Sequence, residues 1–263
     1  MEAYFENDLI TLYNGDCIEV MNEMASNGIK VDKIITSPPY GVRRTTFRDD
    51  QTFYDSYTDE LKDTHNYIDW TIDIFNCYDK VLNKNGCILY NISYGSENTE
   101  LMPLTVSAII ERTDFTLADI LIWKKPVALP NNMASNKFTR ICEFVYVFCR
   151  RSEFGTFTAN KKIKSYSSIG QPFYENVYNF FEASNNDTAQ NLNKCTFSTD
   201  FVYNLIRMYV RDTDVVLDNF SGTGTTVYAC QQRGIKSIGI ELSKDQCDYT
   251  VNRVSGGTPT LLW

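Results

Sequence analysis

The sequence predicts an α/β fold, built on a mostly parallel twisted sheet with helices on both faces. Apolar runs of strand length alternate along the chain with helix-like stretches, as expected for crossover connections between parallel strands. One late run leads through a glycine-rich turn into a helix-like stretch, the arrangement of a Rossmann-type nucleotide site. At 263 residues, the chain is long enough for one such domain with a modest insertion and too short for two.

Six strands and five helices are expected. The apolar, strand-like runs fall at 31–36, 87–92, 117–123, 143–149, 215–218 and 237–240. The helix-like stretches between them fall at 17–25, 66–82, 100–112, 200–210 and 226–233. Residues 41–63 have no clear period, and we expect them to form a loop over the active site.

The first of these strands ends at Ser37-Pro38-Pro39-Tyr40, a segment suited to holding an amino group. Two successive prolines fix the backbone and supply no N–H, which leaves the Ser37 hydroxyl and the Pro38 carbonyl as acceptors. The exocyclic amine of a nucleobase is a poor nucleophile until acceptors hold its two hydrogens, and the Tyr40 ring can stack on the base. Taken alone, the segment is equally consistent with a strand followed by a Pro-Pro turn.

A second motif lies late in the chain. The run that ends at Asp218 leads into Ser221-Gly222-Thr223-Gly224, and glycines in such a turn let the backbone approach a nucleotide. The next strand ends at Glu241, close to the spacing of about 20 residues expected for an acid that binds ribose hydroxyls. A dinucleotide-dependent oxidoreductase is the competing interpretation, but Val227 stands where the third glycine of its fingerprint is expected.

In this order, the two motifs resemble the DNA amino-methyltransferases, which methylate N4 of cytosine or N6 of adenine. Within that family the chain resembles the beta arrangement, in which the catalytic segment comes early and the cofactor loop comes late. The resemblance extends to the segments 12–17, 81–89, 122–126, 143–148 and 196–206. Two positions depart from the family pattern: Asn219 stands where proline is usual, and Lys194-Cys195 stand where His-Pro is common.

The resemblance implies a Rossmann-like methyltransferase fold, S-adenosylmethionine as cofactor, S-adenosylhomocysteine as product and double-stranded DNA as substrate. It identifies Ser37, Pro38, Pro39 and Tyr40 as the catalytic segment. The cofactor-binding residues that it implies come from the N-terminal segment, the catalytic segment, the stretch that closes over the methionine end and the glycine loop with its flanks. They are Asp16, Cys17, Ser37, Phe197, Ser198, Thr199, Asp218, Phe220, Ser221, Gly222, Gly224, Thr225, Thr226, Glu241 and Leu242.

The net charge is −8, so a DNA-binding surface must be local. Seven basic residues against two acidic ones lie between Lys137 and Lys164, and a second basic cluster follows Tyr40 directly. Because these clusters flank the catalytic segment, we expect one basic face on an acidic body. The residues expected to contact DNA are Arg43, Arg44, Arg48, Lys124, Lys125, Lys137, Arg140, Lys161, Lys162 and Lys164.

The domain organisation follows from the same pattern. Residues 1–151 and 196–254 are expected to form a single methyltransferase domain. Residues 152–195, rich in Ser, Asn, Lys and aromatics, interrupt the α/β alternation and are the candidate target-recognition insert. Residues 255–263 are expected to form a loose C-terminal tail.

The base that is methylated follows from the motif only through the resemblance. Serine stands at position 37 where many adenine enzymes carry Asp or Asn, which favours N4 of cytosine, with N6 of adenine as the alternative. Methylation of cytosine C5 requires a cysteine nucleophile, which follows proline in the family that performs it, and the chain has no Pro-Cys dipeptide. A DNA-binding module without catalytic activity is a further alternative, disfavoured because both motifs are intact.

The composition limits which metal sites and which cellular location are to be expected. The eight cysteines never occur as Cys-x-x-Cys and only one histidine is present, so reduced core thiols are expected and no metal site. There is no run of about 20 apolar residues and no signal peptide at the start, so we expect a cytoplasmic protein that does not enter a membrane. A homodimer and a cognate restriction endonuclease remain open as partners.

Overall fold

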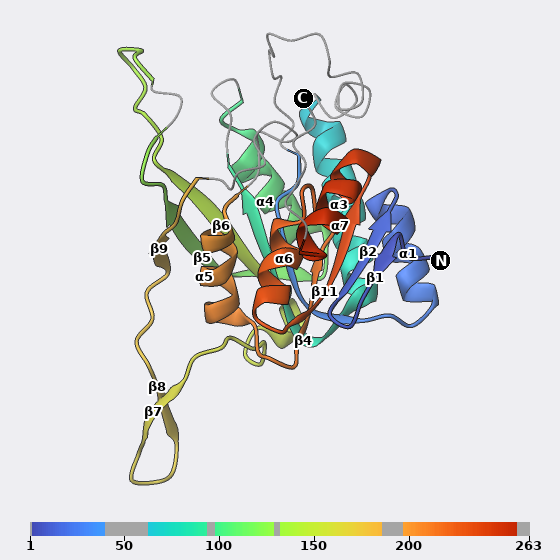
Figure 1. The fold of residues 1–263 in the computed structure, drawn as a ribbon. Coiled ribbons are helices and arrows are strands. Elements are labelled where there is room, and N and C mark those ends of the chain that lie inside the picture. The colour runs from blue at the N-terminus through green and yellow to red at the C-terminus, as the bar shows by residue number, and fades with distance from the viewer. Residues whose placement is uncertain (1, 40–62, 94–97, 129–131, 186–196, 257–263) are drawn as a thin grey trace.

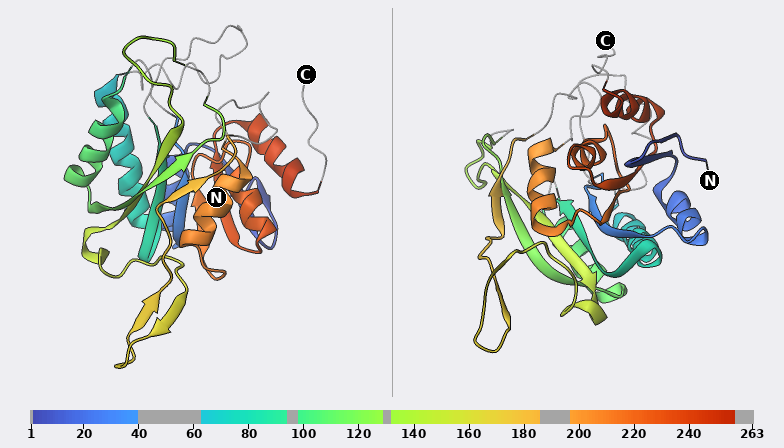
Figure 2. Two further views of the ribbon diagram at one scale, coloured as in Figure 1. Left: turned by 90° about the vertical axis from the view of Figure 1, so that its left-hand side faces the viewer. Right: turned by 60° about the horizontal axis from the view of Figure 1, so that its bottom comes forward.

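The computed structural model describes residues 2–39, 63–93, 98–128, 132–185 and 197–256. A nine-stranded sheet carries helices on both faces (Figures 1 and 2). The helices are α1 (Cys17–Ser26), α3 (Thr64–Val81), α4 (Leu101–Arg112), α5 (Thr199–Tyr209), α6 (Thr225–Gln232) and α7 (Lys244–Val254), with the 3-10 turn η1 (Arg151–Glu153). The strands are β1 (Phe5–Glu6), β2 (Ile10–Asn14), β3 (Val31–Thr36), β4 (Leu82–Ile92), β5 (Phe115–Lys124), β6 (Cys142–Arg150), β7 (Ile163–Tyr166), β8 (Pro172–Tyr174), β9 (Phe180–Glu182), β10 (Val215–Asp218) and β11 (Lys236–Glu241).

The strand order of the main sheet is β1-β2-β11-β10-β3-β4-β6-β5-β9. The pairs β2·β11, β11·β10, β10·β3, β3·β4 and β5·β9 are parallel, whereas β1·β2 and the two pairs made by β6 are antiparallel. From β3 the chain continues to β4 on one side, and from β10 it continues to β11 on the other. The carboxyl ends of β3 and β10 therefore meet at a topological switch point, where open α/β sheets bind ligands.

The core consists of two layers, one on each face of the sheet. Helices α1, α3 and α4 cover one face and α5, α6 and α7 cover the other. Successive strand residues alternate between the layers: Ile34 packs in the first and Ile35 in the second, and Leu217 and Val216 do the same on β10. Because both layers are apolar, the central strands read as continuous hydrophobic runs, which made them recognisable in the sequence.

All six expected strands and all five expected helices are present, with boundaries shifted by a few residues. The sequence did not reveal α7, because Lys244–Val254 is polar overall and its few core residues do not stand out. The five strands it missed are β1, β2, β7, β8 and β9, of which four have two to four residues. Within the described ranges, no helix is long and apolar enough to cross a membrane.

The connection between β6 and β9 starts at the amino-terminal ends of the parallel strands and reaches the sheet again near the carboxyl end of β5. Arg150, at the end of β6, pairs with Phe115 at the start of β5, and β9 runs parallel to β5. The segment that follows β6 thus begins at the amino-terminal edge of the parallel strands and carries the β7–β8 hairpin that projects from the body in Figure 1. It returns to the sheet at β9, which pairs with the last three residues of β5. Part of the expected insert 152–195 is therefore an edge strand of the main sheet, β9.

Candidate active site

Asp218, the last residue of β10, ties the switch point together. Its Oδ1 accepts hydrogen bonds from Thr36 Oγ1 at 2.8 Å and from the Phe220 amide at 3.1 Å, and its Oδ2 accepts one from Thr226 Oγ1 at 2.6 Å. Burial raises its pKa from 3.8 to about 6, against the opposing effect of these three donors. One carboxylate thus connects the ends of β3 and β10 with the first turn of α6.

These bonds change the role expected of Asp218 and Thr226. Both side chains are buried, and the carboxylate already has three donors from the protein itself. We therefore interpret Asp218 and Thr226 as positioning residues rather than direct cofactor contacts. Thr36, which the sequence did not single out, belongs to the same group, and Ser37 follows it directly.

Glu241 stands at the end of the neighbouring strand β11. Its Oε2 accepts from the Gly222 amide and its Oε1 accepts from the Ser243 amide, both at 2.8 Å. Burial raises the pKa of this carboxyl, while the amide donors oppose the shift. Glu241 is 8% exposed, and its two hydrogen bonds fix the orientation of its carboxylate beside the switch point.

The end of β2 borders Glu241 on its other side. Asn14 pairs with Glu241 in the sheet, and its Nδ2 donates to the carbonyls of Glu241 and Leu242, each at 2.9 Å. Asp16 caps α1, its Oδ1 accepting from the Ile18 amide at 2.9 Å. Asp16 and Leu242 therefore lie beside Glu241, where the sequence predicted a cofactor contact.

The glycine loop depends on backbone conformations that other residues rarely adopt. Gly222 has φ 54° and Gly224 has φ 74°. A Cβ on Gly224 would also lie 2.4 Å from Thr250 Cγ2, so this glycine is required for α7 to pack against the loop. Arg253 of α7 holds the same loop from outside: its Nη1 donates to Thr225 Oγ1 at 3.3 Å, and its Nη2 to Thr199 Oγ1 at 3.2 Å.

Arg253 thereby connects the glycine loop to the start of α5, although it escaped the sequence analysis because α7 did. Ser198 is the N-cap of α5; its Oγ accepts from the Phe201 amide at 3.2 Å and donates to the Ser184 carbonyl at 2.8 Å. Phe197 packs on Phe201. The expected methionine-end residues Phe197, Ser198 and Thr199 are thus held beside the glycine loop.

An aromatic pair lines the other side of the loop. Trp70 of α3 lies 5.5 Å from Phe220, measured between ring centroids, and both side chains are partly exposed. Trp70 was missed because a single tryptophan in a helix-like stretch carries no ligand signal. A fixed carboxylate beside a partly exposed ring pair and a glycine turn fits the ribose, adenine and amino-acid ends of S-adenosylmethionine.

Asn219, the departure from the family pattern, is fixed by a hydrogen bond rather than by a ring. Its Oδ1 accepts from the Tyr78 hydroxyl of α3 at 2.7 Å, and both residues are buried. Cys17 is buried as well, and burial raises the pKa of its thiol to about 12. A buried thiol with a raised pKa packs in the core and does not act as a nucleophile.

The catalytic segment begins inside the described ranges and continues beyond them. Pro38 is buried, and Ser37 and Pro39 are partly exposed at the carboxyl end of β3. Tyr40, Arg43, Arg44 and Arg48 lie outside the described residues. In the parts of the chain that the structure describes, no three histidine, cysteine or acidic side chains are grouped so that they could hold a metal ion.

The expectation of one basic face is wrong. Lys137 and Arg140 follow β5 at the carboxyl-terminal edge, whereas Lys161, Lys162 and Lys164 come just after Asn160, whose amide donates to the Met208 carbonyl in the last turn of α5 at the opposite edge. Arg150 and Arg151 are occupied by backbone carbonyls, including those of Leu82 and Ile110. Lys124 and Lys125 form ion pairs with Glu182 and Glu143. Neighbours in sequence were taken for neighbours in space, although β6 carries the chain from one edge to the other.

A family model described as DNA methylase matches residues 31–252. The chain belongs to this DNA methylase family. It is similar to the type II methyltransferase M.BglII of Bacillus subtilis, with 24% identity over 97% of this chain and 71% of that protein. It is also similar to the type II methyltransferase M.Cfr9I of Citrobacter freundii, with 24% identity over 94% of this chain and 88% of that protein.

Solved structures of this kind share the fold of the methylase. The PvuII DNA methyltransferase, described as cytosine-N4-specific, aligns with a TM-score of 0.70 and 18% identity over 100% of this chain and 91% of that one. A complex of M1.HpyAVI with S-adenosylmethionine aligns with a TM-score of 0.62 and 21% identity over 94% of this chain and 100% of that one. The expected methyltransferase fold is confirmed.

The raised pKa of Asp218 predicts a pH dependence of stability. The folded state binds this proton more tightly than the unfolded state, so the contribution of the neutral form is present below about pH 4 and is lost as pH rises to about 6. Asp218→Asn should remove this component and flatten the dependence of the unfolding free energy on pH, measured by urea denaturation. Asp73→Asn, at an exposed position of α3, should keep the wild-type slope. An unchanged slope in Asp218→Asn would contradict the assignment.

Proposed function

We propose that this methylase is a site-specific DNA methyltransferase that modifies N4 of cytosine. Membership of the DNA methylase family carries the general reaction, and S-adenosylmethionine supplies the methyl group. One observation supports the site: Ser37 and Pro38 directly follow Thr36, whose hydroxyl is bonded to the strand that bears the glycine loop. The amine-holding segment and the cofactor-holding loop are thereby fixed to each other.

Each part of the switch point then has a role in binding. Glu241 accepts hydrogen bonds from the ribose hydroxyls, and the Trp70–Phe220 pair packs against the adenine ring. Thr199 and the start of α6 face the amino-acid end, with Arg253 holding both in place. The site supplies position and polarity, which is the main requirement for a direct transfer.

The catalytic segment acts on the base. A cytosine rotated out of the duplex places its N4 amine between the Ser37 Oγ and the Pro38 carbonyl, and the Tyr40 ring stacks on the base. Two acceptors on the amine hydrogens turn the nitrogen lone pair towards the methyl donor. Serine at position 37 supports cytosine, and the similarity to a structure described as cytosine-N4-specific is consistent with it.

The connection between β5 and β6, described at 125–128 and 132–141, is the best-placed described part of the chain to contact DNA. It follows β5 at the same edge as the catalytic segment, and two large apolar side chains stand almost fully in solvent, Met133 at 95% and Phe138 at 94% exposed. Residues 132–139 fold back on themselves, since the Asn132 amide donates to Thr139 Oγ1 at 2.9 Å. Apolar side chains presented in this way can enter between base steps, with Lys137 and Arg140 near the phosphates.

We therefore place target recognition in this loop rather than in the hairpin of the 152–195 insert. The chain enters the hairpin after Asn160, whose amide donates to the Met208 carbonyl in the last turn of α5, at the opposite edge of the sheet from the catalytic segment.

The product tests the proposal most directly. Nucleoside mass spectrometry of DNA methylated by the enzyme should show N4-methylcytosine. Tyr40→Ala should lower methylation by roughly 10- to 100-fold through the loss of about 1–3 kcal/mol of stacking, while Tyr40→Phe, which keeps the ring, should be much milder. N6-methyladenine would overturn the choice of base and leave the geometry standing; 5-methylcytosine would overturn both.

The loop assignment has its own test. Phe138→Ala should weaken binding to the DNA that the enzyme methylates by roughly tenfold, about 1.4 kcal/mol, because an apolar contact with the bases is lost. Phe154→Ala removes a half-exposed phenylalanine at the opposite edge and serves as the matched control. Equal DNA affinity of the two variants, measured by fluorescence anisotropy, would show that the loop stands clear of the DNA.

A further inference from the structure

Arg253, near the end of α7, joins the beginnings of two helices beside the glycine loop. Its Nη1 donates to Thr225 Oγ1 at 3.3 Å, and its Nη2 donates to Thr199 Oγ1 at 3.2 Å. Each threonine is the first residue of its helix, Thr225 in α6 and Thr199 in α5. One guanidinium group thus holds the amino-terminal ends of α5 and α6 together.

The position of the guanidinium group is itself fixed by α6 and the loop. It stacks on the ring of Tyr228 in α6, with Cζ 4.4 Å from the ring centroid. Its Nη1 also donates to the Thr223 carbonyl at 3.5 Å. One turn earlier in α7, Thr250 Oγ1 lies 3.3 Å from the Gly222 carbonyl, so the same face of α7 holds the loop at two points.

The bonds to Arg253 restrict the directions of the two threonine hydroxyl hydrogens. An arginine side chain can only donate, so a hydroxyl that bonds to it accepts and directs its own hydrogen elsewhere. Among the described residues, none accepts a hydrogen bond from the Thr225 hydroxyl, although Thr225 is only 4% exposed. Because a buried donor without an acceptor costs free energy, a bound ligand that accepts is favoured here.

The glycine loop carries two more buried hydroxyl groups. Ser221 Oγ and Thr223 Oγ1 have no hydrogen-bond partner in the described part of the chain, and both residues are buried. Buried polar groups of this kind indicate a place where a polar ligand or water completes the hydrogen bonding. The positive ends of the α5 and α6 dipoles adjoin this loop, which favours a negatively charged group.

We propose that Arg253 is a positioning residue for methyl transfer, which makes the site selective for the carboxylate of S-adenosylmethionine. The inference rests on the proposed function, in which Thr199 and the start of α6 face the amino-acid end of the cofactor. Since Arg253 donates to both hydroxyls, both are left to donate, and an ionised carboxylate only accepts. A carboxylate held in one direction fixes the methionine chain and, with it, the sulfonium methyl group.

The test is the calorimetric binding of S-adenosylhomocysteine and of methylthioadenosine to the full chain. Both ligands contain the adenosine and the sulfur, but only S-adenosylhomocysteine contains the carboxylate. Arg253→Met should weaken binding of S-adenosylhomocysteine by at least about tenfold and leave that of methylthioadenosine within about twofold of wild type. Arg253→Lys, which keeps the charge and can donate to one hydroxyl, should lose less.

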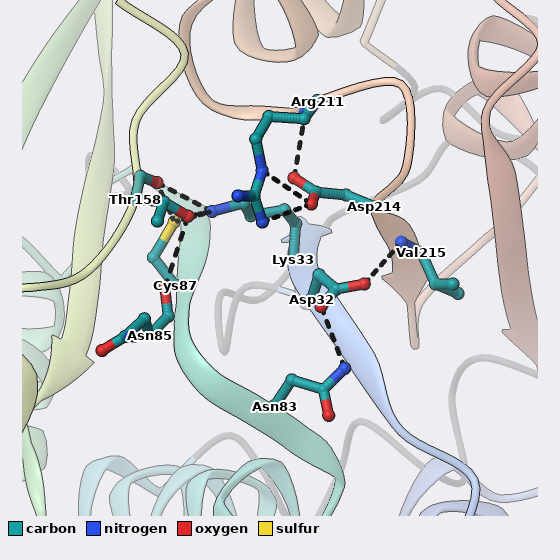
Figure 3. Close-up of polar contacts among 9 residues, drawn as sticks. All are labelled: Asp32, Lys33, Asn83, Asn85, Cys87, Thr158, Arg211, Asp214 and Val215. Carbon is teal, nitrogen blue, oxygen red and sulfur yellow. Dashed lines mark hydrogen bonds and ion pairs between the residues drawn. The ribbon is translucent and has the colours of Figure 1, made fainter.

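Arg211→Met is the matched control. Arg211 also fixes a turn through its side chain, which donates to Asp214 Oδ1 at 3.0 and 2.8 Å, but it does so before the start of β10, at the end of that strand remote from the glycine loop (Figure 3). This variant should bind both ligands as the wild type does. Thr225→Val keeps Arg253 and should reproduce the selective loss, and the two changes together should cost less than the product of the single losses.

Equal losses of affinity for the two ligands in Arg253→Met would overturn the proposal, because they would show that the arginine only maintains the shape of the loop. Unchanged affinity for S-adenosylhomocysteine would overturn it as well. The proposed function is decided by the base that is methylated, which none of these binding measurements involves, so the two fail separately.

Discussion

The hydrogen bond from Thr36 to Asp218 is the contact on which the site depends. It joins β3, which ends in the amine-holding segment, to β10, which ends in the glycine loop, although the two residues are far apart in sequence. Pairing of β3 with β10 aligns the strands, but the side-chain bond joins them at the end where the two loops leave the sheet. The cost of burying the carboxylate is offset by three donors, which makes the junction rigid.

Hydrogen bonds from residues far away in the sequence hold the glycine loop in place. Glu241 holds the Gly222 amide, Arg253 connects the loop to α5, and Tyr78 fixes Asn219 from α3. Each support comes from a different helix or strand. The loop therefore keeps its left-handed glycines with Asn219 at the position before Phe220, because hydrogen bonds hold it in place.

The sequence predicted the central strands and helices because both layers of the core make those strands continuously apolar. It could not predict the bond from Thr36 to Asp218, because a carboxylate before a glycine turn has the same pattern whether it meets a ligand or Thr36. Thr36, Trp70 and Arg253 carry no local signal, since their roles arise from contacts between distant elements. The basic cluster was misread for a related reason: sequence proximity across β6 hides a change from one edge of the sheet to the other.

The most direct measurement is the single-turnover rate of methyl transfer in Thr36→Val at saturating cofactor and DNA, with Thr105→Val as control. Thr105 is equally buried, but its hydroxyl bonds the Leu101 carbonyl within α4. We expect Thr36→Val to slow transfer by about tenfold, equivalent to about 1.4 kcal/mol, with S-adenosylmethionine affinity within roughly twofold of wild type. A transfer rate equal to that of Thr105→Val would contradict the claim that this bond aligns the two halves of the site.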